Sequence, residues 1–213
     1  MRRVTRPTGL RERKKQRTRE AIADVAITMF LAEGFDRVSC AQVAARAEVS
    51  KPTLFKYFPA KEDLVLHRIA DHEDEAADVV RTRRPGESPL DALRRHFLAG
   101  LAARDPITGL NDAPEVIGLH RMIEDTPSLS VHMLGFTARR AETLAAALAH
   151  SDTPADVPVR LVAHQITVTL RVLAEDNLHR LNGDRTPDEA YPEAVAAADR
   201  AFDLLRDGLG DVL

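Results

Sequence analysis

Hydrophobic positions along the chain recur at the three- and four-residue spacing of an amphipathic helix, and they do not alternate as they would in a strand. Between 10 and 33, one stripe collects the apolar residues Ile22, Val25, Ala26, Met29 and Phe30. Gly34 follows at the place where a helix often ends in a residue with positive φ. The pattern therefore predicts a first helix over 10–33.

Two short helical patterns come next, and each is preceded by a serine. Ser39 is placed to cap a helix that runs to about Ala47, and Ser50 to cap a second helix that ends at Phe58, before a proline. Pro52 falls in the first turn of the second helix, where the missing N–H group costs nothing. This stretch predicts a helix, a tight turn and a helix.

The rest of the chain also predicts helices. A long pattern extends from Lys61 to about Arg81, and the stretch "RTRRPGESP" then gives the first clear break. Three further helices open with a hydroxyl residue followed by proline, at Ser88-Pro89, Thr126-Pro127 and Thr186-Pro187. Two other patterns cover about 113–124 and 155–181, and the helix that opens at Thr186-Pro187 extends to about 209. We predict an all-α fold with about nine helices.

The charges divide the chain into parts. The formal net charge is -3, but residues 1–70 carry 15 Lys and Arg against 8 Asp and Glu, whereas the remainder carries 15 against 25. Nine of the positive charges lie in the first 19 residues. Such a segment is either a solvated arm or an arm that binds a polyanion, because each cation placed on a phosphate releases counterions. We expect a basic, flexible arm over 1–16, a small domain over 17–60 and a helical domain over 61–213.

Features of other protein classes are few. No uninterrupted apolar run approaches the roughly 18 residues of a membrane span, and the basic amino terminus does not lead into a signal peptide, so we expect a cytoplasmic protein that binds no membrane. Cys40 stands alone, which favours a small core residue over a redox sensor and excludes a multi-cysteine zinc site. The stretch "HEDEAAD" at 72–78 holds possible metal ligands, but on a helix it is more typical of a solvated face. We expect no metal and no cofactor.

The second short helix carries residues that suit a DNA-reading helix. In a helix-turn-helix the second helix enters the major groove and its first turn reaches base edges. Lys51 and Thr53 can hydrogen-bond to bases, and Pro52 offers an apolar face, while Leu54 and Phe58 are expected in the core. Further contacts to DNA, mostly to phosphates, are expected from Arg13, Lys14, Arg17, Ser39, Gln42, Ser50, Lys56, Tyr57 and Lys61. The alternative is a three-helix core whose surface binds nothing.

The segment from Arg17 to Leu66 resembles the tetracycline-repressor (TetR) family of transcription regulators. The resemblance rests on a first helix that ends in a glycine-aromatic pair, a hydroxyl cap, and "QVA", "VS", "LFKYF" and "KEDL" in the family's order and spacing. Two positions depart from the pattern. Glu48 replaces the usual turn glycine, at a cost of about 1 kcal/mol if its φ is positive. Ala60 replaces a capping residue, again at about 1 kcal/mol.

The resemblance implies a homodimer that places two recognition helices in successive major grooves of a palindromic operator. It also implies that the carboxyl-terminal domain binds a small effector. "GLRERKKQRTREAI" and "FPAKEDLVL" are similar to actinobacterial regulators of the mycofactocin type, for which the effector would be an acyl-coenzyme A. The residues give the dimer modest support, because "VPVRLVAHQITVTLRVLAEDNLHRL" is apolar around most of its circumference and the last helix has a face of small residues. We expect a four-helix interface, two helices from each subunit, that includes Ala194, Ala197, Ala198 and Ala201.

Large side chains on the inward faces of the second domain are either core or pocket wall, and the sequence does not separate the two. Our candidates for ligand binding are Phe97, Met122, Met133, Phe136, Arg140, His164, Thr167 and Arg171. Arg171 either pairs with Glu175, four residues later, or holds an anionic ligand. An apolar chamber with Arg or His groups would suit an amphipathic anion such as an acyl or aromatic acid conjugate.

Together these features predict a ligand-responsive repressor, with the helix over 61–81 as the lever between ligand and DNA. A ligand that prefers a conformation with another spacing of the reading heads would lower the affinity for the operator. An architectural DNA-binding protein and a helical enzyme are the alternatives. The enzyme lacks support, because there is no Gly-rich phosphate loop, no "HExxH" and no nucleophile elbow, so we name no catalytic residue.

Overall fold

The computed structural model describes residues 10–70, 72–149, 155–181 and 185–209. Within these residues the chain forms ten α-helices, one short 3-10 helix and no strand, which confirms the all-α prediction. The helices are α1 Leu10–Glu33, α2 Cys40–Arg46, α3 Lys51–Tyr57, α4 Lys61–Ala70, α5 Glu75–Arg81, α6 Pro89–Ala103, α7 Pro114–Asp125, α8 Pro127–Leu148, α9 Val157–Arg180 and α10 Pro187–Leu209, with the 3-10 helix η1 at Pro106–Thr108.

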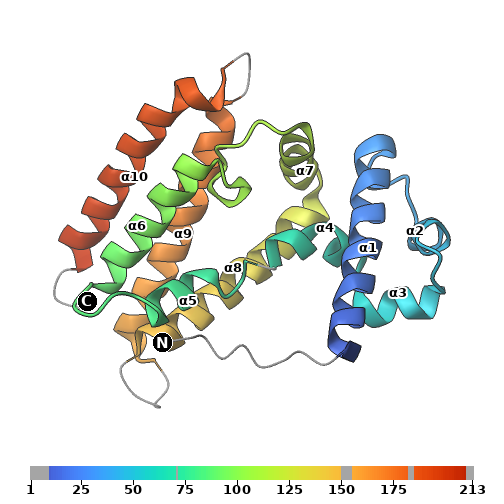
Figure 1. The fold of residues 1–213 in the computed structure, drawn as a ribbon, viewed down its shortest axis with the longest axis horizontal. Coiled ribbons are helices and arrows are strands. Elements are labelled where there is room, and N and C mark those ends of the chain that lie inside the picture. The colour runs from blue at the N-terminus through green and yellow to red at the C-terminus, as the bar shows by residue number, and fades with distance from the viewer. Residues whose placement is uncertain (1–9, 71, 150–154, 182–184, 210–213) are drawn as a thin grey trace.

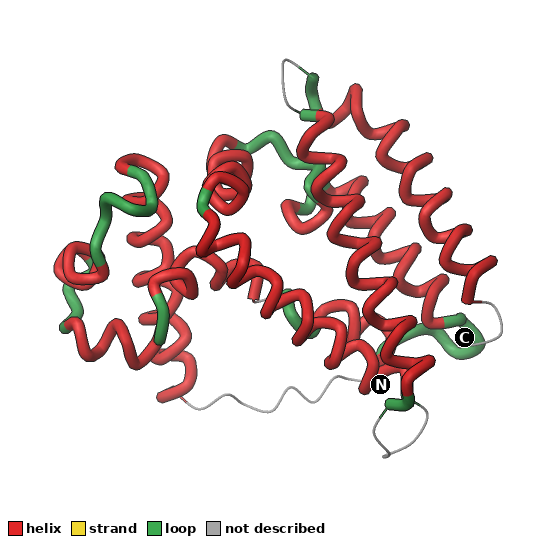
Figure 2. Tube along the Cα trace, turned by 180° about the vertical axis from the view of Figure 1, so that it is seen from behind, coloured by secondary structure: helices red, strands yellow, loops and turns green. Residues whose placement is uncertain are grey.

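Helices α1 to α4 gather at one end of the molecule, which we call the head (Figure 1). α2 packs on α1 and α3, and α4 packs on α1. At the other end α6, α9 and α10 lie side by side, and α8 runs from the head to α9 (Figures 1 and 2). α5 packs on α6 and α8. We call the part from α5 to α10 the effector domain, after the role that the family resemblance implies for it.

The hydrophobic core of the head continues into the effector domain. Leu54, Phe58 and Leu64 are fully buried in it, as the sequence predicted for the first two. The same cluster includes Ile123 from α7 and Phe136 from α8. The expected domain boundary after residue 60 therefore does not interrupt the packing. α4 shares the core of α1 to α3, and residues of α7 and α8 extend that core.

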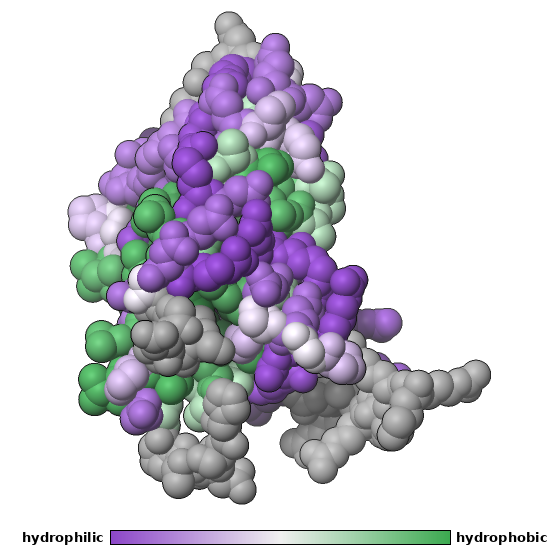
Figure 3. All heavy atoms as spheres, turned by 90° about the vertical axis from the view of Figure 1, so that its left-hand side faces the viewer, coloured by the Kyte–Doolittle hydropathy of each residue, from purple (hydrophilic) through white to green (hydrophobic). Residues whose placement is uncertain are grey.

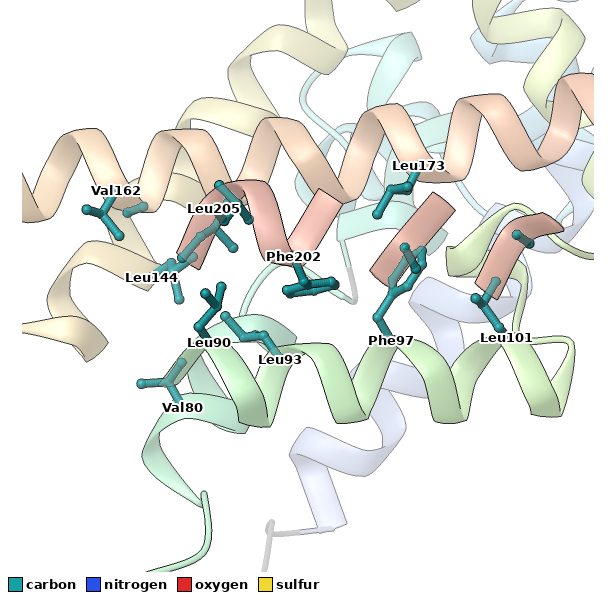
Figure 4. Close-up of a cluster of buried hydrophobic side chains, with 14 of the residues drawn as sticks. Val80, Leu90, Leu93, Phe97, Leu101, Leu144, Val162, Leu173, Phe202 and Leu205 are labelled. Carbon is teal, nitrogen blue, oxygen red and sulfur yellow. The ribbon is translucent and has the colours of Figure 1, made fainter. Parts of the chain in front are cut away.

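A second core fills the effector domain, between α6, α9 and α10 (Figure 4). At the centre of this core, the ring centroids of Phe97 and Phe202 are 6.4 Å apart. Ala194 and Ala198 of α10 have no exposed surface, because they pack in this core. These two alanines were expected at a dimer interface. That expectation is wrong for them, because the chain buries their face itself.

The single helix expected over 61–81 is two helices. α4 ends at Ala70, α5 begins at Glu75, and the N–H of Glu75 donates to the carbonyl of His72 at 3.3 Å as in a turn. The side chain of Glu75 bonds to His72 and to His96 of α6. These polar contacts tie the start of α5 to α6.

Candidate nucleic-acid interface and effector domain

Both helices of the expected DNA-reading pair begin with side-chain caps. Ser39 Oγ accepts the N–H of Gln42 at 3.3 Å, and the Gln42 side chain accepts the N–H of Ser39 at 2.8 Å, so the capping box is complete. Ser50 Oγ accepts the N–H of Thr53 at 3.2 Å. Both serine caps are as predicted. They fix the starts of helices that are too short to be stable alone.

The outward face of α3 presents a mixed basic and apolar surface. Leu54 and Phe58 are fully buried behind it, and Tyr57 is half-buried. The hydroxyl of Thr53 lies 2.7 Å from Ser50 Oγ, so the two hydroxyls share a hydrogen bond. Because either hydroxyl can be the donor in this pair, a base contact by Thr53 would use its methyl group, a lone pair or, where Ser50 donates, its own O–H. The exposed residues of α3 are Lys51, Pro52, Phe55 and Lys56.

Phe55 was missed at the sequence level. It is 38% exposed, and the Nζ of Lys51 lies 5.9 Å from its ring centroid. The sequence contained a signal, because Phe55 follows Lys51 by four residues and so shares its helix face.

The turn between α2 and α3 has the strain expected at Glu48. Its φ is 55°, in the left-handed region that glycine adopts without cost. The N–H of Val49 then donates to the carbonyl of Ala44 at 2.9 Å and closes the turn. The replacement of the usual glycine by Glu48 therefore costs this chain stability.

Lys61 has a structural role that was not expected. Its ammonium donates to the carbonyl of Phe35 at 2.6 Å and lies 4.2 Å from the ring centroid of Phe35 and 5.5 Å from that of Phe30. These contacts hold the loop between α1 and α2 against the start of α4. Since an ammonium has three donors, a phosphate contact by Lys61 stays a prediction.

Ala60 has no side chain that could cap α4, and the carboxylate of Asp63 accepts its backbone N–H instead. Asp63 Oδ2 accepts the N–H of Ala60 at 2.9 Å, so this backbone donor keeps a partner. The other oxygen, Oδ1, lies 2.9 Å from Nε2 of His132 on α8. One carboxylate thus joins the end of the α3–α4 loop to the effector domain.

The basic residues of the arm are partly helical. α1 begins at Leu10, so the segment 10–16, which was assigned to a flexible arm, belongs to the helix. The hydroxyl of Thr18 donates to the carbonyl of Lys14 at 3.0 Å within it. Arg13, Lys14 and Arg17 are exposed along this first part of α1. Residues 1–9 of the expected arm lie outside the described residues.

The apolar residues proposed for the effector do not share one site. Phe97 is buried in the core of the effector domain, against Phe202. Phe136 belongs to the cluster of the head, and Met122 and Met133 pack against that cluster. Only Met122 and Met133 of these four are half-buried, as a pocket wall would be.

The polar candidates on α9 already have protein partners. The hydroxyl of Thr167 donates at 2.8 Å to a backbone carbonyl one turn earlier in its own helix. His164 lies 3.8 Å from a carboxylate oxygen of Glu142 on α8. Arg171 pairs with Glu175, so of the two interpretations left open, the structure favours the pair.

Arg140 instead lies in a polar cluster between α5, α6 and α8. Glu75 Oε2 is 2.9 Å from Nδ1 of His72, and Glu75 Oε1 is 3.0 Å from Nε2 of His96. These two hydrogen bonds lower the pKa of Glu75, and the bond to Glu75 raises the pKa of His72 above its ordinary value. Burial lowers the pKa of Arg140, against the attraction of Glu75 and Glu73. Within the described residues no group of three His, Cys, Asp or Glu side chains is placed to hold a metal ion.

A hollow of about 590 Å³ lies where the loop after α5 meets the ends of α8 and α9. Its wall includes Glu87, whose carboxylate accepts from Arg95 at 2.8 and 3.0 Å. These bonds hold the pKa of Glu87 at about 2. None of the eight expected ligand-binding residues lines this hollow, whose wall also contains Arg81, Arg83, Arg84, Leu148, Val159 and Val162.

The outward face of α9 exposes a row of large apolar side chains. Val157, Leu161, Val168 and Val172 are 66%, 58%, 42% and 49% exposed. Figure 3 shows the end of the molecule away from the head, where hydrophobic residues gather along the left-hand edge. α9 is the one described helix long and apolar enough to cross a membrane by length and composition. It also packs on α8 and α10, as a helix of a folded domain does.

The comparisons with known proteins agree with this arrangement. Residues 22–67 match the family model of bacterial regulatory proteins of the tetR family. The HTH-type transcriptional regulator TcmR of Streptomyces glaucescens is 34% identical over 143 residues, which cover 66% of this chain and 61% of TcmR. The HTH-type transcriptional repressor KstR of Rhodococcus jostii (strain RHA1) is 33% identical over 76 residues, covering 36% of this chain and 35% of KstR. A TetR-family regulator from Streptomyces coelicolor A3 has the same fold, with a TM-score of 0.56 at 20% identity over 89% of this chain and 96% of that chain.

Proposed function

Because the chain belongs to the TetR family of bacterial regulatory proteins, we propose that it is a cytoplasmic transcriptional repressor that binds operator DNA as a homodimer and is released by a small effector. The observation that carries the proposal is the outward face of α3. Lys51, Pro52 and Lys56 are exposed there, whereas the opposite face of the same helix is fully buried. A helix of seven residues held in this way presents its first turn to a major groove.

The dimer would use the apolar row of α9. Four large apolar side chains exposed in one row are costly in water, and a second copy of the chain would cover them. Half-sites on DNA lie about 34 to 36 Å apart for a dimer of this kind. The pairing of two chains therefore sets the distance between the two α3 helices.

The effector would act between α5, α6 and α8. The cluster of Glu75, His72, His96 and Arg140 offers polar anchors there, and the half-buried Met133 lies on the same helix as Arg140. We propose a small amphipathic or apolar effector, with acyl and aromatic acids as the first classes to test. To release DNA, such a ligand must bind the DNA-free conformation more tightly than the DNA-bound one.

DNA binding is tested by competition. Operator sequences selected from random duplexes are expected to bind at least about 10³ times more tightly than unrelated duplex at physiological salt. Lys51→Ala is expected to relax the base preference, whereas Lys56→Ala is expected to weaken binding to all sequences and to reduce the salt dependence. Arg200→Ala removes an exposed cation from α10 and serves as the matched control. Equal binding to selected and random DNA would refute the regulator.

The second candidate is an architectural protein that binds DNA without regard to sequence. The basic first part of α1 favours this activity, because Arg13, Lys14 and Arg17 can hold phosphates of any sequence. The same competition separates the two candidates, since an architectural protein would bind both duplexes alike. The relatives are transcription regulators, and we propose no enzymatic activity.

A further inference from the structure

Phe55 is the exception among the phenylalanines. The chain has seven, and the other six are at most 7% exposed, whereas Phe55 is 38% exposed. It is not among the residues that form or pack against the hydrophobic core of the head. Its ring therefore stands on the surface of the helix that the proposed function places in the major groove.

The surroundings of Phe55 make it part of one continuous face. Lys51 and Pro52 precede it by four and three residues, which puts all three on the same side of α3. The Nζ of Lys51 lies 5.9 Å from the ring centroid, within the range of a cation–π contact. The face thus combines a hydrogen-bond donor with an apolar surface about one helical turn wide.

An apolar ring can distinguish one base by contact. In the major groove adenine, guanine and cytosine present hydrogen-bonding groups, and only thymine adds a methyl group. A phenyl ring placed against a hydrogen-bonding edge would remove water from it without replacing the bond. Against a thymine methyl, the ring instead buries apolar surface.

We infer that Phe55 is a specificity-determining residue, which selects thymine in each operator half-site by contact with its C5 methyl group. The inference rests on the proposed function. The ring of Phe55 has a second role, because its cation–π contact also positions the ammonium of Lys51. The selected thymine is therefore expected beside the base pair or phosphate that Lys51 contacts.

The experiment replaces thymine by uracil, which lacks only the methyl group. An operator is first selected from random duplexes with the wild-type chain, and each thymine is then changed to uracil in both half-sites. Affinities are measured by fluorescence anisotropy at one salt concentration. The loss of one methyl contact in each half-site is expected to lower wild-type affinity about 15-fold, or about fourfold per half-site, at one thymine position.

Variants of α3 assign that loss to Phe55. Phe55→Ala is expected to bind the thymine and uracil duplexes equally, while Lys56→Ala, at the next exposed position of α3, weakens binding to both duplexes alike and keeps the wild-type ratio. Phe55→Leu keeps apolar bulk and is expected to keep part of the ratio, and thermal unfolding confirms that each variant is folded. A Phe55→Ala variant with the wild-type ratio, or a wild-type chain indifferent to every methyl, overturns the inference alone. A wild-type chain that selects no sequence overturns the proposed function as well.

Discussion

Two residues other than glycine have a positive φ in the described part of the chain, and they predict opposite effects of the same substitution. Glu48 and Arg104 both have a φ of 55°. In this region a side chain costs about 1–2 kcal/mol, because Cβ crowds the following carbonyl. Glycine removes this cost but loses about 0.5–1 kcal/mol of additional chain entropy on folding. Where no side-chain contact is lost, the net gain in the free energy of unfolding is the difference between these two terms, about 0.75 kcal/mol at the middle of both ranges.

Glu48→Gly is expected to give this full gain. The side chain is exposed, and within the described residues it has no hydrogen bond or ion pair to lose. Arg104→Gly relieves the same strain but removes contacts. Arg104 donates to the carbonyl of Leu101 at 2.8 Å, pairs with Asp188 and lies 4.7 Å from the ring centroid of Tyr191. Since these contacts together exceed the gain, we expect a net loss of about 1 kcal/mol.

The assay is urea unfolding at one protein concentration, followed by circular dichroism. Glu48→Ala keeps Cβ and therefore the strain, so its free energy of unfolding should stay within about 0.5 kcal/mol of wild type. Glu48→Gly should be more stable than both. If the glycine and alanine variants at 48 are equally stable, the turn is not strained and the reasoning is wrong. If Arg104→Gly is also stabilised, its side-chain contacts contribute nothing.

Three further predictions concern single contacts. His132→Ala is expected to lower the free energy of unfolding by about 1 kcal/mol only while Asp63 is present, which a double-mutant cycle measures as non-additivity. Because the pKa of His72 is raised, its contribution is full below the ordinary value of 6.5 and is lost as the pH rises through the raised pKa. The pKa of Glu75 is lowered from 4.5, so its contribution to stability is present above that value and is lost as the pH falls through the lowered pKa. Urea unfolding measured against pH should therefore show both losses in the wild type, and His72→Gln should lack the one on the alkaline side. Leu161→Asp is expected to produce monomers, seen by light scattering, and an unchanged mass would show that α9 is not the interface.

Local signals made the starts of several helices predictable in both parts of the molecule. Ser39 and Ser50 cap α2 and α3 because a hydroxyl can reach an N–H group three residues later in any sequence context. Three helices begin at a proline that follows a hydroxyl residue, as expected, at Pro89, Pro127 and Pro187. Such features depend on neighbours in the chain. These signals therefore do not depend on the tertiary contacts of the helix.

Contacts between distant segments were not predictable in the same way. Glu75 lies in a stretch of polar residues typical of a solvated face, and its partner His96 is 21 residues away. The alanines of α10 have a pattern that suits either an interface or a core, and α6 decides for the core. In the same way the sequence predicts that Lys61 is on the surface, whereas in the structure its ammonium donates to the carbonyl of Phe35. In each case a tertiary partner selects one of two outcomes that the local pattern allows.

If an effector binds at the Glu75 cluster as proposed, α8 can transmit its effect to α3 without a long fourth helix. Arg140, beside the Glu75 cluster, and His132, bonded to Asp63, lie eight residues apart on this one helix, about 12 Å along its axis. Phe136 lies between them in the sequence and is buried in the core of the head. A ligand that displaces α8 near Arg140 must therefore carry the partner of Asp63 with it. Because Asp63 also accepts from the N–H of Ala60, shortly after α3, the displacement would reach α3 through two hydrogen bonds and a shared core.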